Sequence, residues 1–269
     1  MQPATPSTTE LRDLPQPLPQ TPAELPDIPG GWTERTWTLA GRSLRLFLPA
    51  VPDAFLDDPQ VAEAHARDEY MPYWAFLWPA SWHLAQAVCR QPWPPGTPLV
   101  ELGAGVGLVG LAALATGYRV TFTDYDPLAV HLCRVNAVRN GFDDFQAEVV
   151  DWRRPPDWRF PVILGCELLY EDRNHEPLLE LTRRWLTPGG WAWFADGGRT
   201  KAERFFRLLP RYGLEATILD ETGAVLSNLR VGRYQCLVVR HQSERAGPAG
   251  QPPEASPRST RAEPIEPNR

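Results

Sequence analysis

The stretch VELGAGVGLVG, residues 100–110, decides the fold of this chain. An apolar run reaches Glu101, glycines follow at Gly103, Gly105 and Gly107, and an apolar segment then resumes. Glycine allows a tight turn between a strand and a helix and lets the backbone approach a ligand closely. The pattern therefore predicts a strand, a ligand-binding turn and a helix, which together form the opening unit of an α/β domain.

The rest of the chain continues this alternation of strands and helices. Strands are expected at PLVELG, YRVTFTD, AEVVDW, PVILGCEL and WAWFADG, and helices at GLVGLAALATG, PLAVHLCRVNAVRNG, HEPLLELTRRWLTPGG and TKAERFFRLLPRYG. Near-continuous apolar strands separated by helices are typical of a parallel sheet that is covered on both faces. The last two strands, LEATILDE and RYQCLVVRH, have no helix between them, which predicts an antiparallel C-terminal edge.

Residues before the first glycine turn predict an N-terminal extension. WTERTWTLAGRSLRLFLPA reads as a β-hairpin with its turn near Ala40-Gly41, residues 53–70 as a short helix or loop, and Ser81 as the N-cap of the next helix. The fold class is therefore α/β: a doubly wound, mostly parallel, seven-stranded Rossmann-like sheet with an antiparallel C-terminal edge and an N-terminal β-hairpin extension.

Proline marks the boundaries of the folded part. Residues 1–31 and 242–269 are rich in proline and poor in large apolar side chains, so both are expected to be disordered. Residues 32–241 form a single domain, divided into an extension over 32–75 and a Rossmann-like core over 76–241.

Composition excludes several classes of function. A net charge of −6 gives no basic face for nucleic acid. No apolar run approaches the length of a membrane span, and the start MQPATPSTTELRDLPQ lacks the features of a signal peptide. The four cysteines lie far apart without a C-x-x-C pair, so neither a metal site nor a disulfide framework is expected. This cysteine usage predicts a reducing, cytoplasmic location.

The acids around the glycine turn indicate the ligand. Asp124 ends the next strand about 20 residues further on, where a carboxylate binds the two hydroxyls of a ribose. The spacing Gly105-x-Gly107-x-x-Gly110 also satisfies the dinucleotide fingerprint, which keeps NAD as an alternative. Glu101, however, suits the positive amino group of a methionine moiety and would repel a pyrophosphate. This favours S-adenosyl-L-methionine.

Longer motifs carry a resemblance to a known family. They are PYWAFLWPAS, VELGAGVGLVGLAA, VTFTDYDPLAV, VVDWRRP, VILGCELLYED and LTPGGWAWFADGGR. Through them, residues 72–200 resemble the class I, seven-β-strand S-adenosylmethionine-dependent methyltransferases, and more narrowly the protein-lysine methyltransferases marked by a D-x-x-Y motif. PYWAFLWPAS and DGGR are similar to the lysine methyltransferases of the electron-transfer flavoprotein β subunit.

The resemblance implies roles for individual residues. Asp124 would hold the ribose, Asp151 with Trp152 would flank the adenine, and Trp78 would cover the cofactor. The complete set of expected cofactor-binding residues is Trp78, Glu101, Gly103, Ala104, Gly105, Gly107, Asp124, Tyr125, Asp151, Trp152 and Cys166. Glu167 and Tyr170 are the expected catalytic residues, and Trp74, Asp196 and Arg199 the expected substrate-binding residues.

A lysine acceptor sets a chemical requirement on these residues. With a free pKa of about 10.4, the amine must lose a proton before it attacks. A carboxylate next to it favours the ammonium, so Glu167 is expected to dock and orient the amine, with Tyr170 and Trp74 packing around the cation.

Two positions depart from the resembled pattern. Glu167 stands where the family motif has aspartate, which moves the carboxylate by roughly 1–1.5 Å, and Gly197 stands where the similar enzymes have proline. The predicted function is N-methylation of a lysine in a protein partner, with no nucleic acid or membrane partner; a monomer is compatible with the sequence. The alternatives are methylation of a small-molecule amine or another nitrogen nucleophile, and an NAD(P)-binding oxidoreductase or nucleotide-binding module.

Overall fold

The computed structural model describes residues 25–242. The expected disorder of residues 1–24 and 243–269 therefore lies outside the described residues. Residues 25–31, also expected to be disordered, pack instead: Leu25 and Ile28 lie against the core, and the indole N–H of Trp32 donates to the Pro26 carbonyl at 2.7 Å. The two apolar side chains bury enough surface to fix this segment.

One sheet dominates the described part of the chain, with eight strands within residues 25–242. In spatial order they are β5 (Phe145–Val149), β4 (Arg119–Asp124), β3 (Pro98–Leu102), β6 (Phe160–Cys166), β7 (Leu186–Asp196), β10 (Gln235–His241), β8 (Leu214–Leu219) and β9 (Val225–Leu226). The first five run parallel, and β10 is antiparallel to both of its neighbours. The predicted fold class is confirmed, with the two-residue strand β9 as an addition and β10 inserted between β7 and β8.

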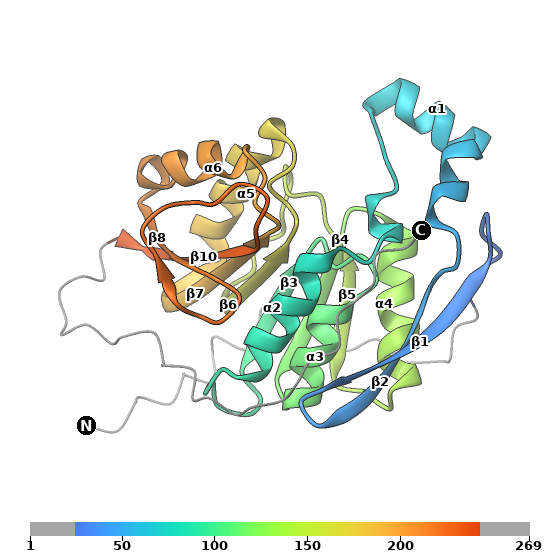
Figure 1. The fold of residues 1–269 in the computed structure, drawn as a ribbon, viewed down its shortest axis with the longest axis horizontal. Coiled ribbons are helices and arrows are strands. Elements are labelled where there is room, and N and C mark those ends of the chain that lie inside the picture. Colours follow the sequence, from blue (N-terminus) through green and yellow to red (C-terminus); the bar gives the residue numbers. More distant parts are fainter. Residues whose placement is uncertain (1–24, 243–269) are drawn as a thin grey trace.

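Helices cover both faces of this sheet (Figure 1). One face carries α2 (Pro79–Cys89), α3 (Leu108–Thr116) and α4 (Pro127–Arg139), and the other carries α5 (Asp172–Trp185), α6 (Ala202–Leu208) and the short helix η4 (Leu209–Tyr212). The central strands β3 and β6 are buried along almost their whole length, which explains their continuous apolar sequences. Among the helices of residues 25–242, none has the length and apolarity needed to cross a membrane.

The predicted N-terminal hairpin is confirmed as β1 (Trp32–Leu39) and β2 (Arg42–Pro49). Both turn residues, Ala40 and Gly41, have positive φ angles, as a two-residue hairpin turn requires. The hairpin is held to α4 by Asn136, whose amide oxygen accepts from the Phe47 N–H at 2.7 Å and whose amide nitrogen donates to the Phe47 carbonyl at 3.1 Å.

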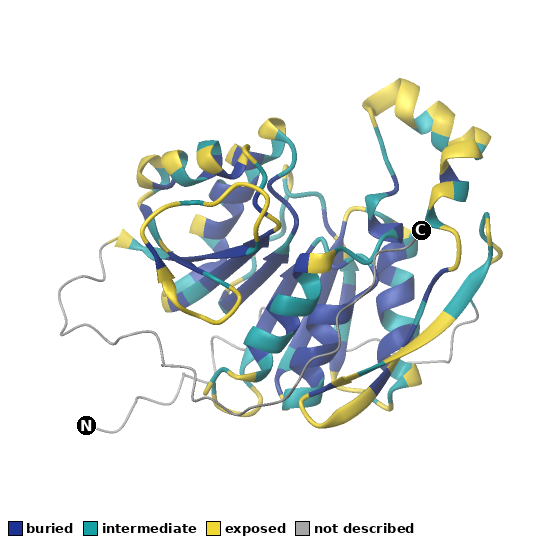
Figure 2. Ribbon diagram, viewed as in Figure 1, coloured by how far each residue is buried: buried dark blue, intermediate teal, exposed yellow. Residues whose placement is uncertain are grey.

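A helical segment then leads to the sheet edge that carries the site. It comprises η2 (Pro52–Asp57), α1 (Pro59–Asp68) and η3 (Tyr73–Ala75). Helix α1 has no buried residue and projects from the body of the domain (Figure 2). The prediction that Ser81 caps α2 is wrong: Pro79 starts the helix, and the Ser81 hydroxyl lies inside it, donating to the Trp78 carbonyl at 2.6 Å.

Candidate active site

A cavity of about 650 Å³ lies at the carboxyl end of the parallel strands, where open α/β sheets bind ligands. Its size is typical of small-molecule sites, which span about 300–1,000 Å³. The predicted site residues that line it are Trp74, Trp78, Glu101, Gly103, Ala104, Gly105, Asp124, Tyr125, Asp151, Trp152, Cys166, Glu167, Tyr170 and Arg199. The other two predicted site residues, Gly107 and Asp196, do not line the cavity.

The glycine turn after β3 leaves no space for side chains. A β-carbon on Gly103 would lie 2.5 Å from Cδ2 of Leu168, and one on Gly105 would lie 3.3 Å from the carbonyl oxygen of Trp74. Both glycines also have positive φ angles. The turn is therefore packed directly against the two segments that flank the cavity, and its backbone is free to approach a ligand.

Glu101 anchors the start of α3. Its Oε2 accepts a hydrogen bond from the N–H of Gly110 at 2.8 Å, and a β-carbon on Gly110 would lie 2.6 Å from that oxygen and 2.3 Å from Cε1 of Phe122. Gly110 is thus required for the close packing of α3 against β3 and β4. Burial raises the pKa of Glu101 to about 8 from its ordinary value of 4.5.

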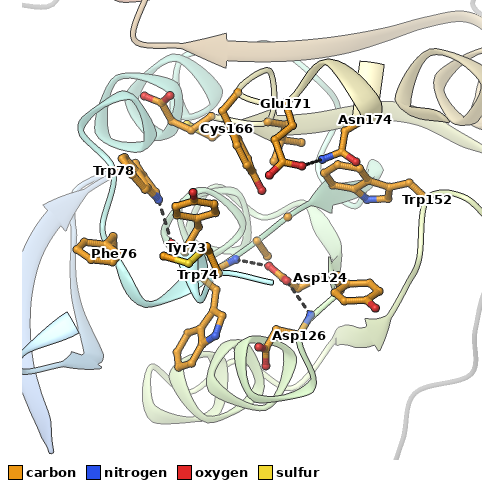
Figure 3. A pocket seen from close by; sticks show the side chains of 18 of the residues that line it. Tyr73, Trp74, Phe76, Trp78, Asp124, Asp126, Trp152, Cys166, Glu171 and Asn174 are labelled. Atoms are coloured by element: carbon orange, nitrogen blue, oxygen red, sulfur yellow. Dashed lines mark hydrogen bonds between the residues drawn. The ribbon is translucent and has the colours of Figure 1, made fainter. Parts of the chain in front are cut away.

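Asp124 ties the end of β4 to the glycine turn. Its Oδ2 accepts from the N–H of Gly105 at 2.9 Å and its Oδ1 accepts from the N–H of Asp126 at 3.0 Å (Figure 3). Burial raises the pKa of Asp124 to about 6. The carboxylate therefore lies at the cavity wall with its orientation fixed by two backbone donors.

Asp126, which was not among the predicted site residues, joins the N-terminal extension to this wall. One carboxylate oxygen caps α4 by accepting from the Leu128 N–H at 2.7 Å, and the other accepts from the Tyr70 hydroxyl. The indole N–H of Trp74 donates to the same hydroxyl at 3.3 Å. The cap was recognisable from the Asp-Pro pair at the helix start, but the contact with Tyr70 was not.

Aromatic and charged side chains flank the side of the cavity next to β5. Trp152 lies beside Gly103, and its buried indole N–H has no hydrogen-bond partner in residues 25–242. Asp151 pairs with Arg153 at 2.8 Å, and that guanidinium lies 5.6 Å from the centre of the Tyr125 ring. Figure 3 shows Trp152 across the cavity from Trp78.

Glu167 lies at the opposite end of the cavity with an unusual backbone. Its φ angle is +59°, in the left-handed region that few non-glycine residues occupy, and its N–H donates to the Ala195 carbonyl at 2.8 Å. Such conformations cost of order 1–3 kcal/mol and cluster at functional sites. Here the conformation turns a carboxylate that is only 7% exposed toward the turn that follows β7.

That turn brings Asp196 and Arg199 to Glu167. The Arg199 guanidinium forms an ion pair with Glu167, lies 3.4 Å from Oδ2 of Asp196, and lies 5.4 Å from the centre of the Trp78 ring. Asp196 is completely buried and accepts from the N–H groups of Gly198 and Arg199 at 2.7 and 2.6 Å. Three predicted residues from two separate motifs therefore form one charged cluster beside Trp78.

Aromatic rings line the same cavity as Glu167 and Arg199. The Tyr170 ring lies 5.0 Å from Tyr73 in an edge-on arrangement, and Tyr73 lies 6.3 Å from Trp78. Tyr73 had not been predicted. Trp74 lines the cavity, and its ring also packs against Phe55 with 5.3 Å between the ring centres; its expected contact with substrate stays a prediction.

Cys166 ends β6 beside Glu167. Burial raises the pKa of its thiol well above the ordinary value of 9.0. The thiol is therefore protonated, and its role is to fill space next to the cavity. Within residues 25–242, no group of three or more His, Cys, Asp or Glu side chains is arranged to hold a metal ion.

Solved structures and known sequences define the class of this protein. A TehB-like SAM-dependent methyltransferase from Corynebacterium glutamicum superposes with a TM-score of 0.50 and 18% identity, over 71% of this chain and 100% of that chain. The fold is thus that of the class I methyltransferases. A sequence model described as lysine methyltransferase matches residues 78–211.

Two curated relatives are protein methyltransferases by name. EEF1A lysine methyltransferase 3 of Mus musculus is 32% identical over 59% of this chain and 67% of its own length. A histidine protein methyltransferase 1 homolog of Dictyostelium discoideum is 29% identical over 50% of this chain and 48% of its own length. The chain thus spans about half the length of the second relative.

The chain belongs to the lysine methyltransferase family, and it is an S-adenosylmethionine-dependent methyltransferase by family and fold. The predicted family and enzyme class are confirmed, and the NAD-dependent alternative is wrong.

Proposed function

We propose that this chain binds S-adenosyl-L-methionine in the cavity and methylates the side-chain nitrogen of a lysine in a protein substrate. The observation that carries the proposal is the arrangement at Glu167: a buried carboxylate that lines the same cavity as the aromatic side chains of Tyr73, Tyr170 and Trp78. An acid beside aromatic faces is the chemistry that binds an alkylammonium.

The residues of the cavity fit this cofactor. Asp124 presents a fixed carboxylate suited to the ribose hydroxyls, and Trp152 has a buried N–H without a partner in the described residues. Glu101 lines the cavity near the glycine turn, and the methionine ammonium would favour its ionised form, since the pKa of Glu101 is about 8 without that cation. Trp78 lies across the cavity from Trp152. When bound, the cofactor supplies a methyl group on a positively charged sulfur.

The chain contributes orientation and exclusion of water. Glu167 attracts and aligns the acceptor ammonium, which then releases its proton to solvent because a free amine is needed for attack. The free amine held at Glu167 would attack the methyl carbon that the bound cofactor would supply, and the electron pair of the carbon–sulfur bond would leave with the sulfur. Holding the two reactants in line accounts for most of the acceleration.

Two observations support a protein acceptor and a cytoplasmic location. By their names, one relative is a methyltransferase for EEF1A lysine and the other for protein histidine. All four cysteines lie in the described part of the chain as free thiols, which is typical of a reducing compartment.

The experiment has two stages. Calorimetric titration with S-adenosylhomocysteine and, separately, with NAD tests the cofactor: we expect binding of the first alone. Transfer of a radiolabelled methyl group into cell lysate, separated into protein and small-molecule fractions, then tests the acceptor. Label in the protein fraction supports the proposal, and label confined to small molecules favours the small-molecule amine instead.

A further inference from the structure

The cluster at the acceptor end of the cavity contains one cation for two carboxylates. Glu167 is 7% exposed and Asp196 is 0% exposed, and both are within ion-pair distance of the single guanidinium of Arg199. Buried carboxylates are costly unless they are paired. The cluster therefore has a deficit of positive charge that a second cation would satisfy.

Arg199 lies where an alkylammonium would be expected to bind. Its guanidinium contacts the Glu167 carboxylate and lies 5.4 Å from the Trp78 ring centre, so it uses the acid and the aromatic face that the proposed function assigns to the acceptor. We propose that Arg199 holds the acceptor's position in the free protein and that the acceptor ammonium displaces it. This inference rests on the proposed function and makes Arg199 the residue that selects a cationic acceptor.

The exchange is feasible because Arg199 has a second partner and a route to solvent. Its side chain is 29% exposed, and Asp196 remains within reach at 3.4 Å when the contact with Glu167 is lost. Asp196 stays in place because two backbone N–H groups of its own turn bind it, at 2.7 and 2.6 Å. After the exchange, two cations face two carboxylates and the charge is balanced.

Charge then decides which acceptors reach Glu167. A neutral or anionic side chain cannot replace the guanidinium on Glu167, because it offers no charge to compensate the buried carboxylate. A lysine ammonium can, and its slender chain suits a space bordered by Tyr73, Tyr170 and Trp78. Selection against neutral acceptors such as unprotonated histidine follows from the pairing itself.

The test uses n-butylammonium, which reproduces the lysine side chain, and n-butanol as its neutral counterpart. Binding is measured by calorimetry on the full chain, with and without S-adenosylhomocysteine. If Arg199 holds the position at least nine-tenths of the time, Arg199→Met should bind n-butylammonium at least about tenfold more tightly than the wild type. The double variant Arg199→Met/Glu167→Gln should lose this gain, and n-butanol should show none.

Arg240 provides a matched control. Its Nε lies 2.9 Å from Oε1 of Glu215, its guanidinium lies 5.7 Å from the centre of the Trp191 ring, and its side chain is 33% exposed. It therefore repeats the arginine–carboxylate–tryptophan arrangement away from the cavity. Arg240→Met should bind n-butylammonium as the wild type does.

A measurement on the wild type covers the case in which Arg199→Met does not fold. The NMR signal of the Arg199 Nε–H should shift as n-butylammonium is added. Absence of that shift would overturn the inference. So would a gain in n-butylammonium affinity that persists in Arg199→Met/Glu167→Gln, or one that is equally large in Arg199→Met and Arg240→Met. Failure of S-adenosylhomocysteine to bind any variant would instead contradict the proposed function.

Discussion

A β-carbon on Gly197 would lie 3.1 Å from Oε1 of Glu167. These are the two positions at which the sequence departs from the pattern it resembles, and they meet at the acceptor end of the cavity. Gly197 does not have a positive φ angle, so its backbone does not require glycine. The carboxylate of Glu167, one methylene longer than an aspartate, occupies the space next to Gly197 that a side chain there would restrict.

The first prediction concerns this pair. Gly197→Ala should reduce methyl transfer by about tenfold, because a new methyl group at 3.1 Å pushes the Glu167 carboxylate out of line. In a Glu167→Asp background the same change should cost much less, since the shorter acid no longer reaches the methyl group. Rates for the two single variants and the double variant form a double-mutant cycle, and strictly additive effects would contradict the coupling.

The second prediction concerns the pH dependence of stability. Since the pKa of Glu101 is about 8 in the folded protein and near 4.5 when unfolded, unfolding releases a proton between those values. The free energy of unfolding should therefore fall as pH rises through this window, by at most about 1.4 kcal/mol per pH unit from this group.

Glu101→Gln should flatten this dependence. Denaturant titrations between about pH 6.5 and about pH 8 isolate Glu101, because the similar effect of Asp124, with its pKa of about 6, is largely complete below that range. Equal slopes for wild type and variant would show that Glu101 is not protonated in the folded state.

The third prediction separates cofactor binding from turnover. Asp124→Asn keeps an acceptor for the Gly105 N–H but removes the charge, so affinity for S-adenosylhomocysteine should fall by about tenfold or more. Calorimetry provides the measurement. Asp157→Asn, at a side chain that is 76% exposed and paired with Arg159, is the control and should leave the affinity unchanged.

The fourth prediction concerns the N-terminal extension. Tyr70→Phe removes the hydroxyl that bonds to Asp126 and accepts from Trp74, so the free energy of unfolding should fall by about 1 kcal/mol and cofactor affinity by a few fold. Tyr212→Phe, which removes an exposed hydroxyl bonded to Glu176 at 3.2 Å, is the matched control. Equal effects of the two changes on cofactor affinity would show that the extension does not support the cavity.

Local patterns were sufficient to predict the sheet, the glycine turn and the acids that follow it. Gly103, Gly105 and Asp124 lie within one strand–helix–strand unit, where spacing along the chain determines proximity in space. The start of α2 was misread because Pro79, with its restricted φ angle, begins the helix before the serine at position 81.

Contacts between distant segments could not be predicted from such patterns. Tyr70 and Asp126 are 56 positions apart and meet only because the extension folds back over the sheet edge. The pairing of Glu167 with Arg199 depends on the left-handed backbone at residue 167 and on the parallel alignment of β6 with β7. Likewise, Trp74 lies in a motif but packs against Phe55, which the motif does not contain.

The most direct test of the account is mass spectrometric identification of the residue that this protein methylates in lysate, with Glu167→Ala as the comparison. We predict methyl groups on the Nζ atoms of lysines in protein, absent with Glu167→Ala, whose affinity for S-adenosylhomocysteine stays within a few fold of the wild type. Methyl groups on histidine, arginine or small molecules, or full activity of Glu167→Ala, would contradict it.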